Sequence, residues 1–125
     1  MSPLANVLWA ALRQRGWDAT DLVKASGVPK QTVSNILNDV NKGAPKVPTL
    51  AKLAKALDIP TEQLVVVAAK TQPAGSVTDV TRAAILLERV PWMAQGIDRI
   101  AELSEAEFRQ WLDFAEYLIH QRGQG

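Results

Sequence analysis

The sequence predicts an all-α protein in which a helical N-terminal domain is followed by a C-terminal helical hairpin. Apolar residues recur at intervals of three and four in successive segments of the 125-residue chain, the spacing that places them along one side of an α-helix. Short clusters of serine, threonine, aspartate, proline and glycine, which begin or end helices, separate these segments. We therefore expect a domain over residues 1–70, a linker over 71–78 and a helical region over 79–125.

The first helix is expected from Leu4 to Arg15. Ser2 and Pro3 form a favourable start, since proline suits the first helical turn, and Gly16 provides a stop. The buried side of this helix is predicted to consist of Leu4, Val7, Leu8, Ala11 and Leu12.

A helix, a tight turn at Gly27 and a short second helix form the most informative segment of the chain. Apolar residues recur at helical spacing on both sides of the turn, so one side of each helix can pack on a shared core. The outward side of the second helix contains no acidic residue and consists of Lys30, Gln31, Thr32, Ser34, Asn35 and Asn38. Such side chains suit phosphate oxygens and base edges, so the pattern predicts a helix presented to the major groove of DNA. An ordinary helical hairpin with a solvated polar side is the alternative.

Residues 4–66 resemble the lambda-repressor/Cro-type (XRE-like) helix-turn-helix family. The resemblance is carried by short motifs in the family's order, which are Gly27-Val28, Thr32-Val33-Ser34, Thr49-Leu50, Leu53-Ala54 and Ala56-Leu57. It implies a five-helix DNA-binding domain, here followed by a C-terminal helical oligomerisation hairpin. Double-stranded DNA, bound in the major groove, is the implied partner.

Three residues depart from the family's pattern. Ala19 stands where the family usually has a glutamine that touches a phosphate, which puts that contact in doubt. Val23 replaces an alanine that lets the two helices approach closely, and Pro29 replaces the usual capping serine or threonine. Because proline is tolerated in a first helical turn, we expect the second helix to form without that capping hydrogen bond. Asp18 and Asp21 resemble a capping box for the helix before the turn.

Base reading is assigned to Lys30, Gln31 and Asn35, because residues near the start of a recognition helix and one turn later project into the groove together. The predicted DNA-backbone contacts are Thr32, Ser34, Asn38, Lys42, Lys46 and Arg13. In related repressors the loop after the recognition helix rests against the DNA backbone, which is what the resemblance implies for Lys42 and Lys46; a solvated loop is the alternative. Arg13 and Arg15 would alternatively interact with the C-terminal dipole of the first helix.

Charge is divided unequally along the chain. Residues 1–70 contain nine Lys/Arg and five Asp/Glu, whereas residues 71–125 contain five Lys/Arg and eight Asp/Glu. A mildly basic half suits a polyphosphate partner and an acidic half suits a protein partner. Chance scatter of surface charge would give a similar difference.

The segment after Lys70 is rich in turn-forming residues and reads as the linker. We expect a helix over Asp79–Arg89, a second helix restarting at Pro91, and a last helix opened by the capping box Ser104–Glu107. The expected dimerisation contacts are Met93, Ile97, Ile100, Phe108, Trp111, Leu112, Ala115, Leu118 and Ile119.

A partner is expected for this C-terminal region. Some 45 residues bury little surface by folding on themselves, so the apolar sides of these helices require cover. The simplest cover is a second subunit, giving a homodimer or higher homo-oligomer through residues 79–122; packing back on residues 4–66 is the alternative. Residues 97–120 also resemble the Sin-type helical-hook interaction module, which implies an antirepressor protein as a further partner.

Several classes of function are excluded by composition. The chain has no cysteine, which removes disulfides, thiolate metal sites and cysteine nucleophiles. No catalytic or metal-binding constellation surrounds the single histidine, His120, so we expect no enzyme activity, cofactor or metal. No apolar run approaches the roughly 18 residues of a membrane span, and no signal layout begins the chain. A cytoplasmic, nucleoid-associated protein without membrane contact is expected.

The sequence as a whole predicts a sequence-specific DNA-binding transcriptional regulator, a homodimeric repressor of a palindromic operator. Two recognition helices about 34 Å apart along the duplex would read such a site together. The alternative is a protein-interaction adaptor, or an antitoxin-type autoregulator, that uses the C-terminal helices and binds DNA weakly or not at all.

Overall fold

The computed structural model describes residues 2–40, 45–72, 75, 77–90, 97 and 99–124. Within these ranges the regular elements are helical, and no strand is present, which confirms the all-α prediction. A 3₁₀ turn over residues 99–102 precedes the last helix. The helices are α1 (Pro3–Arg15), α2 (Ala19–Ser26), α3 (Lys30–Leu37), α4 (Val47–Leu57), α5 (Thr61–Lys70), α6 (Asp79–Arg89) and α7 (Glu105–Gln124). None of the helices in these ranges is long and apolar enough to cross a membrane.

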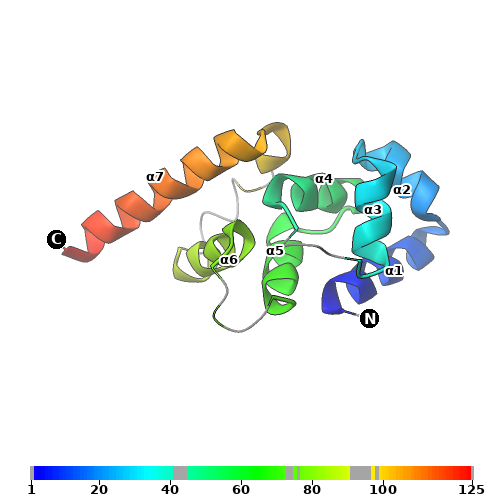
Figure 1. The fold of residues 1–125 in the computed structure, drawn as a ribbon, viewed down its shortest axis with the longest axis horizontal. Helices are drawn as coiled ribbons and strands as arrows, with labels where there is room; N and C mark the ends of the chain where they lie inside the picture. Colours follow the sequence, from blue (N-terminus) through cyan, green and yellow to red (C-terminus); the bar gives the residue numbers. More distant parts are fainter. Residues whose placement is uncertain are drawn as a thin grey trace.

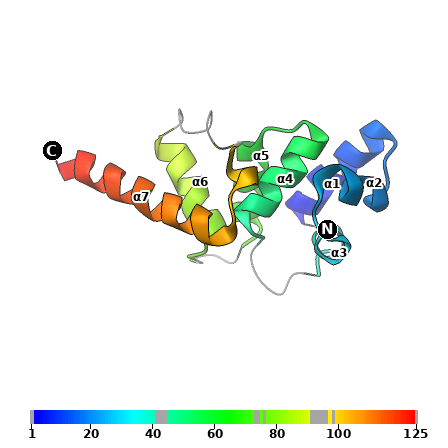
Figure 2. The ribbon, with the colours of Figure 1, turned by 90° about the horizontal axis from the view of Figure 1, so that it is seen from above.

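The helices form an elongated arrangement (Figure 1). Helices α1 to α5 gather at one end, α6 lies beside α5, and α7 runs along α6 and extends away from the other helices. The view from above agrees, and both views place α3 and the C-terminal end of α7 at opposite ends of the molecule (Figure 2). A partner bound at one of these ends therefore leaves the other accessible.

Local capping chemistry sets the starts and ends of the N-terminal helices. Ser2 caps α1, since its hydroxyl accepts a hydrogen bond from the amide of Ala5 at 3.2 Å. Gly16 ends α1 with φ 67°, a left-handed conformation that glycine adopts without steric cost. The predicted capping box at the start of α2 is present: Asp18 and Asp21 each accept a hydrogen bond from the other's amide.

The hydrophobic core is continuous from α1 to α7. Leu8 of α1, Leu53 of α4 and Leu64 of α5 belong to the same buried cluster as Val80 of α6 and Phe108 of α7. Among the described helices, α5 and α6 contact each other most extensively. The residues predicted as a linker therefore do not separate two independent cores; Thr71 and Gln72 form a turn after α5, and Thr78 caps α6.

This core changes the assignment of the expected dimerisation residues. The members that are at most 5% exposed, and so already covered within one chain, are Ile97, Ile100, Phe108, Leu112 and Ala115. These five are covered within one chain, which corrects the expected subunit contact: α7 packs on α6 and also back on α4 of the N-terminal domain. Trp111 and Ile119 are half-buried, Leu118 is exposed, and Met93 lies outside the described residues.

An ionic network joins α6 to α7. The Arg82 guanidinium donates hydrogen bonds to Asp113 at 2.6 Å, to Asp79 at 3.4 Å and to Glu116. These carboxylates raise the pKa of Arg82 above its already high ordinary value, with Glu116 as the main cause. Arg109 of α7 adds a contact to Asp79 at 3.3 Å. Because each partner comes from one of these two helices, the network fixes how α7 lies on α6.

Candidate nucleic-acid interface

Helix α3 presents its polar side because its apolar side is buried. Val33, Ile36 and Leu37 pack in the core, and Val28 anchors the turn that precedes the helix. Gly27 makes that turn with φ 73°, a backbone conformation that a side chain would strain. As predicted, α3 begins after Pro29 without a side-chain capping hydrogen bond.

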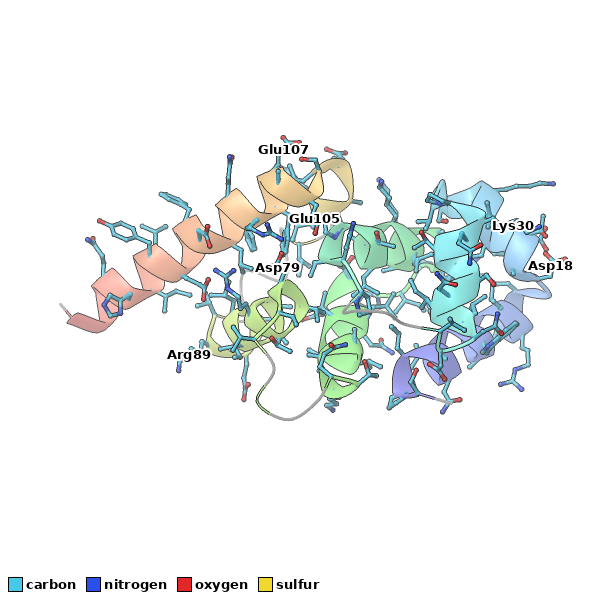
Figure 3. All side chains as sticks on the ribbon, in the orientation of Figure 1. Asp18, Lys30, Asp79, Arg89, Glu105 and Glu107 are labelled. Atoms are coloured by element: carbon cyan, nitrogen blue, oxygen red, sulfur yellow. The ribbon has the colours of Figure 1, made fainter. Side chains whose placement is uncertain are left out.

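The three predicted base-reading residues lie together on the outer side of α3. Lys30 and Gln31 are exposed in the first turn, and Asn35 is half-buried one turn later. Figure 3 shows Lys30 extending outward from α3, at the end nearest α2. The Gln31 Nε2 atom donates a hydrogen bond to Asn35 Oδ1 at 2.9 Å, so the two amides act as one unit. The pair still offers the Gln31 Oε1 acceptor and the Asn35 Nδ2 donor, the complement of the adenine N6 and N7 edge.

Thr32, Ser34 and Asn38, predicted to contact the DNA backbone, are on the same helix. Thr32 and Ser34 are half-buried, whereas Asn38 is exposed at the C-terminal end of α3. The Asn38 Nδ2 atom donates to the Ser34 hydroxyl at 3.2 Å, which orients both groups along one edge of the helix. Short polar side chains of this kind reach phosphate oxygens only at close approach, so their use requires α3 to enter the groove.

Contacts from α1 hold the C-terminal end of α3 in place. The Trp9 indole donates to the Leu37 carbonyl at 2.9 Å, so this tryptophan has a packing role. The amide and hydroxyl of Ser2 donate to Asp39 at 2.8 and 2.5 Å. The hydrogen bond from the Ser2 hydroxyl, followed by that from its amide, lowers the pKa of the Asp39 carboxyl below its ordinary value. Sequence reasoning missed this second contact, since the residues are 37 positions apart.

Of the predicted backbone-contacting cations, Lys46 has a protein partner. Its Nζ lies 3.1 Å from the Glu105 carboxylate, and both side chains are largely exposed, so the pair is open to exchange with a phosphate. Arg13 is exposed at the end of α1, and Lys42 lies outside the described residues. Arg15 instead donates to the Leu57 carbonyl at 3.0 Å and lies over the Trp17 ring, which assigns it to the C-terminal end of α4.

The N-terminal end of α2 is poorly suited to bind a DNA phosphate. Asp18 and Asp21 occupy two of its first amides through the capping box, and their carboxylates add negative charge there. Ala19 has no polar side chain to offer in place of the family's glutamine. DNA contact at this domain would therefore depend mainly on α3, and not on the start of α2.

Comparison with known protein families finds a match to part of the chain. Residues 10–64, which contain α2, α3 and α4 with the C-terminal part of α1 and the first turn of α5, match the family model described as Helix-turn-helix. The match covers under half of the chain and includes the turn at Gly27 and the outer side of α3. Domains of this type are DNA-binding domains of transcriptional regulators. No curated protein and no solved structure matches the chain.

Proposed function

We propose that this chain, whose residues 10–64 are a helix-turn-helix domain of the lambda-repressor (XRE-like) type, is a homodimeric repressor that binds a palindromic operator. It would be a cytoplasmic, nucleoid-associated protein that acts without enzyme activity. In this proposal α3 enters the major groove, and the bound protein blocks access to a promoter.

The observation that carries the proposal is the outer side of α3. Lys30, Gln31 and Asn35 project from a helix whose other side is buried, and that outer side contains no acidic residue. The hydrogen bond between the two amides restricts both side chains before binding, which reduces the side-chain entropy lost on binding a base. Lysine suits guanine, and the amide pair suits adenine, so we expect an operator half-site in which both bases are read.

Backbone contacts would come from the edges of α3 and from neighbouring cations. The proposed set is Thr32, Ser34, Asn38, Lys42, Lys46 and Arg13. Within residues 1–70, basic residues outnumber acidic ones, which supports association with DNA. Residues 71–125 have a net negative charge and would be repelled by the phosphates. Because α7 extends away from α3, the acidic residues beyond its first turn need not approach the duplex, whereas Glu105 at its start lies beside Lys46 (Figures 1 and 2).

A dimer is proposed because one recognition helix reads few base pairs. Two copies related by a two-fold axis would place two α3 helices on successive major grooves and read a palindrome. An antirepressor protein that competes for the C-terminal helices would be a further partner.

The competing function is a protein-interaction adaptor or an antitoxin-type autoregulator. Two observations favour it: the carboxylates of Asp18 and Asp21 sit at the start of α2, and Phe114 and Tyr117 are exposed on α7. Both functions use α7, but only the repressor requires sequence-specific DNA binding through α3.

Selection of duplexes from a randomised pool distinguishes the repressor from the protein-interaction adaptor. The full chain should enrich a palindromic sequence, and a variant with Lys30, Gln31 and Asn35 all changed to alanine should enrich none. A matched variant with Gln63→Ala, an exposed amide on α5, should enrich the same palindrome as the unmodified chain. Absence of enrichment by the unmodified chain would support the adaptor.

A further inference from the structure

Helix α7 has an inner side in the core and an apolar outer side that the chain leaves uncovered. Phe114 is 60% exposed, Tyr117 56% and Leu118 46%, and these are three of the seven large hydrophobic side chains exposed among the described residues. They follow the half-buried Trp111 at helical spacing, so the four residues share one side of the helix. We call this side, from Glu107 to Gln121, the outer face of α7.

The outer face points away from the rest of the chain. Glu107 lies two turns before Phe114 on the same side, and Figure 3 shows its side chain directed away from α6 and α4. The inner side, with Phe108 and Leu112, is the one that enters the core. Because α3 lies at the other end of the molecule, a partner on the outer face would not cover the DNA-binding surface (Figure 1).

We infer that the outer face of α7 binds the same face of a second copy, with the two helices antiparallel and a two-fold axis beside Phe114. In this register Glu107 of each copy lies opposite Gln121 of the other, and Trp111 lies opposite Tyr117. The inference rests on the proposed homodimer and replaces the buried residues first expected at its interface with exposed ones.

Charge selects the antiparallel direction. Helical spacing places Glu107, Gln110, Trp111, Phe114, Tyr117, Leu118 and Gln121 on the outer face, and Glu107 is the charged member. A parallel pair would bring the two Glu107 carboxylates against each other, which is repulsive. An antiparallel pair separates them by the length of 14 helical residues, about 21 Å, and also opposes the two helix dipoles.

The area of this face predicts a weak dimer. An aromatic side chain offers about 200 Å², so the exposed fractions of Phe114, Tyr117 and Leu118 give about 300 Å² per copy. The pair would bury about 600 Å² through these side chains, below the roughly 1,200 Å² of a standard stable interface. We expect dissociation in the micromolar range, with dimers favoured further when both copies hold adjacent half-sites.

Cysteine pairing tests the register, because the natural chain has no cysteine to interfere. Under mild oxidation, a mixture of Glu107→Cys and Gln121→Cys variants should form the mixed disulfide in preference to either homodimer. A disulfide needs Cα atoms within about 7 Å, so it reports direct opposition of the two positions. Preferential Glu107→Cys homodimers would overturn the antiparallel arrangement, and absence of any disulfide would overturn the contact.

Sedimentation velocity tests the contact itself. The unmodified chain should shift from monomer to dimer between about 1 and 100 μM, whereas Phe114→Glu should stay monomeric throughout. The matched control is Ile85→Glu on α6, which is 52% exposed and lies off the outer face; it should dimerise like the unmodified chain. A monomeric unmodified chain, or loss of the dimer in the Ile85 variant alone, would overturn the inference.

Binding to a half-site separates this inference from the proposed function. Phe114→Glu should bind a single half-site as well as the unmodified chain does, and should bind the full palindrome less tightly. Equal binding of the palindrome by both proteins would overturn the inference and leave the repressor in place. Dimerisation without binding to any duplex would instead remove the repressor and leave the α7 contact in place.

Discussion

Replacing Phe108 with alanine should destabilise the whole chain, because this residue joins α7 to the core. Phe108 is 0% exposed and belongs to the cluster that contains Leu53 and Leu64 of the N-terminal helices. Its ring also stacks on Trp111, with centroids 5.9 Å apart. The substitution would open a cavity where α7 meets the rest of the chain.

The expected loss can be compared with that at Phe114 on the same helix. A buried phenylalanine covers about 200 Å² and its replacement by alanine costs about 3–5 kcal/mol, cavity included. Phe114 is 60% exposed, so about 80 Å² of it is covered, and part of that belongs to atoms that alanine retains. At about 25 cal/mol per Å², the covered area corresponds to about 2 kcal/mol at most, so Phe114→Ala should cost less than this and less than Phe108→Ala.

Urea unfolding followed by circular dichroism measures both losses. Protein at about 1 μM keeps the proposed α7 dimer from contributing. One cooperative transition is expected for all three proteins, with the Phe108→Ala midpoint much lower and the Phe114→Ala midpoint close to that of the unmodified chain. Tryptophan fluorescence should report the same midpoints, since tryptophans lie both in the N-terminal helices (Trp9) and on α7 (Trp111).

Two-step unfolding of Phe108→Ala would contradict the coupling of α7 to the N-terminal helices through one core. If Phe108→Ala unfolded in two steps, with the second at the midpoint of the unmodified chain, α1 to α5 would be stable alone. The continuous core would then not couple the two regions. Equal losses for Phe108→Ala and Phe114→Ala would contradict the assigned inner and outer sides of α7.

Three further predictions follow from the site and the caps. Asn35→Ala should weaken binding to the selected operator by about 1–3 kcal/mol, about 5- to 150-fold, and relax selection at one base, as measured by competition with single-base variants. Glu105→Gln should increase DNA affinity by releasing Lys46, whereas Lys46→Ala should reduce the salt slope of binding by about 1 in a log–log titration. Hydrogen bonds from the Ser104 amide, then its hydroxyl, lower the pKa of Glu107 below 4.5, so this pair stabilises the fold above that pH and the contribution disappears as the pH falls through the lowered value. Ser104→Ala keeps the amide and removes the hydroxyl, so it should move the Glu107 pKa, followed by NMR, part of the way back toward 4.5; an unmoved pKa would contradict the contribution of the hydroxyl.

Local patterns predicted the N-terminal helices because the relevant interactions span few residues. The turn at Gly27, the uncapped start at Pro29 and the Asp18–Asp21 box all depend on neighbours within one helical turn. The outer side of α3 was predictable for the same reason, since burial of Val33, Ile36 and Leu37 determines which residues face outward. These features follow from periodicity and capping chemistry alone.

Contacts between distant segments were not predictable in this way. Lys46 and Glu105 are 59 positions apart, and Arg82 meets Asp113 and Glu116 only because α7 lies along α6. The buried part of the expected dimer interface was wrong because the reasoning treated residues 79–125 as a separate unit. Helix α7 packs on α4 as well as on α6, and no pattern within residues 79–125 reveals the surface that α4 offers.

The proposed function depends on DNA reading by α3. The most direct test is a fluorescence-anisotropy titration of the full chain against its selected duplex and a scrambled duplex, at several salt concentrations from about 50 to 200 mM. A dimer that neutralises roughly 6–10 phosphates should lose about 10³- to 10⁵-fold in affinity over this range and should prefer the selected duplex throughout. Equal binding to both duplexes, or binding that salt does not weaken, would contradict the claim.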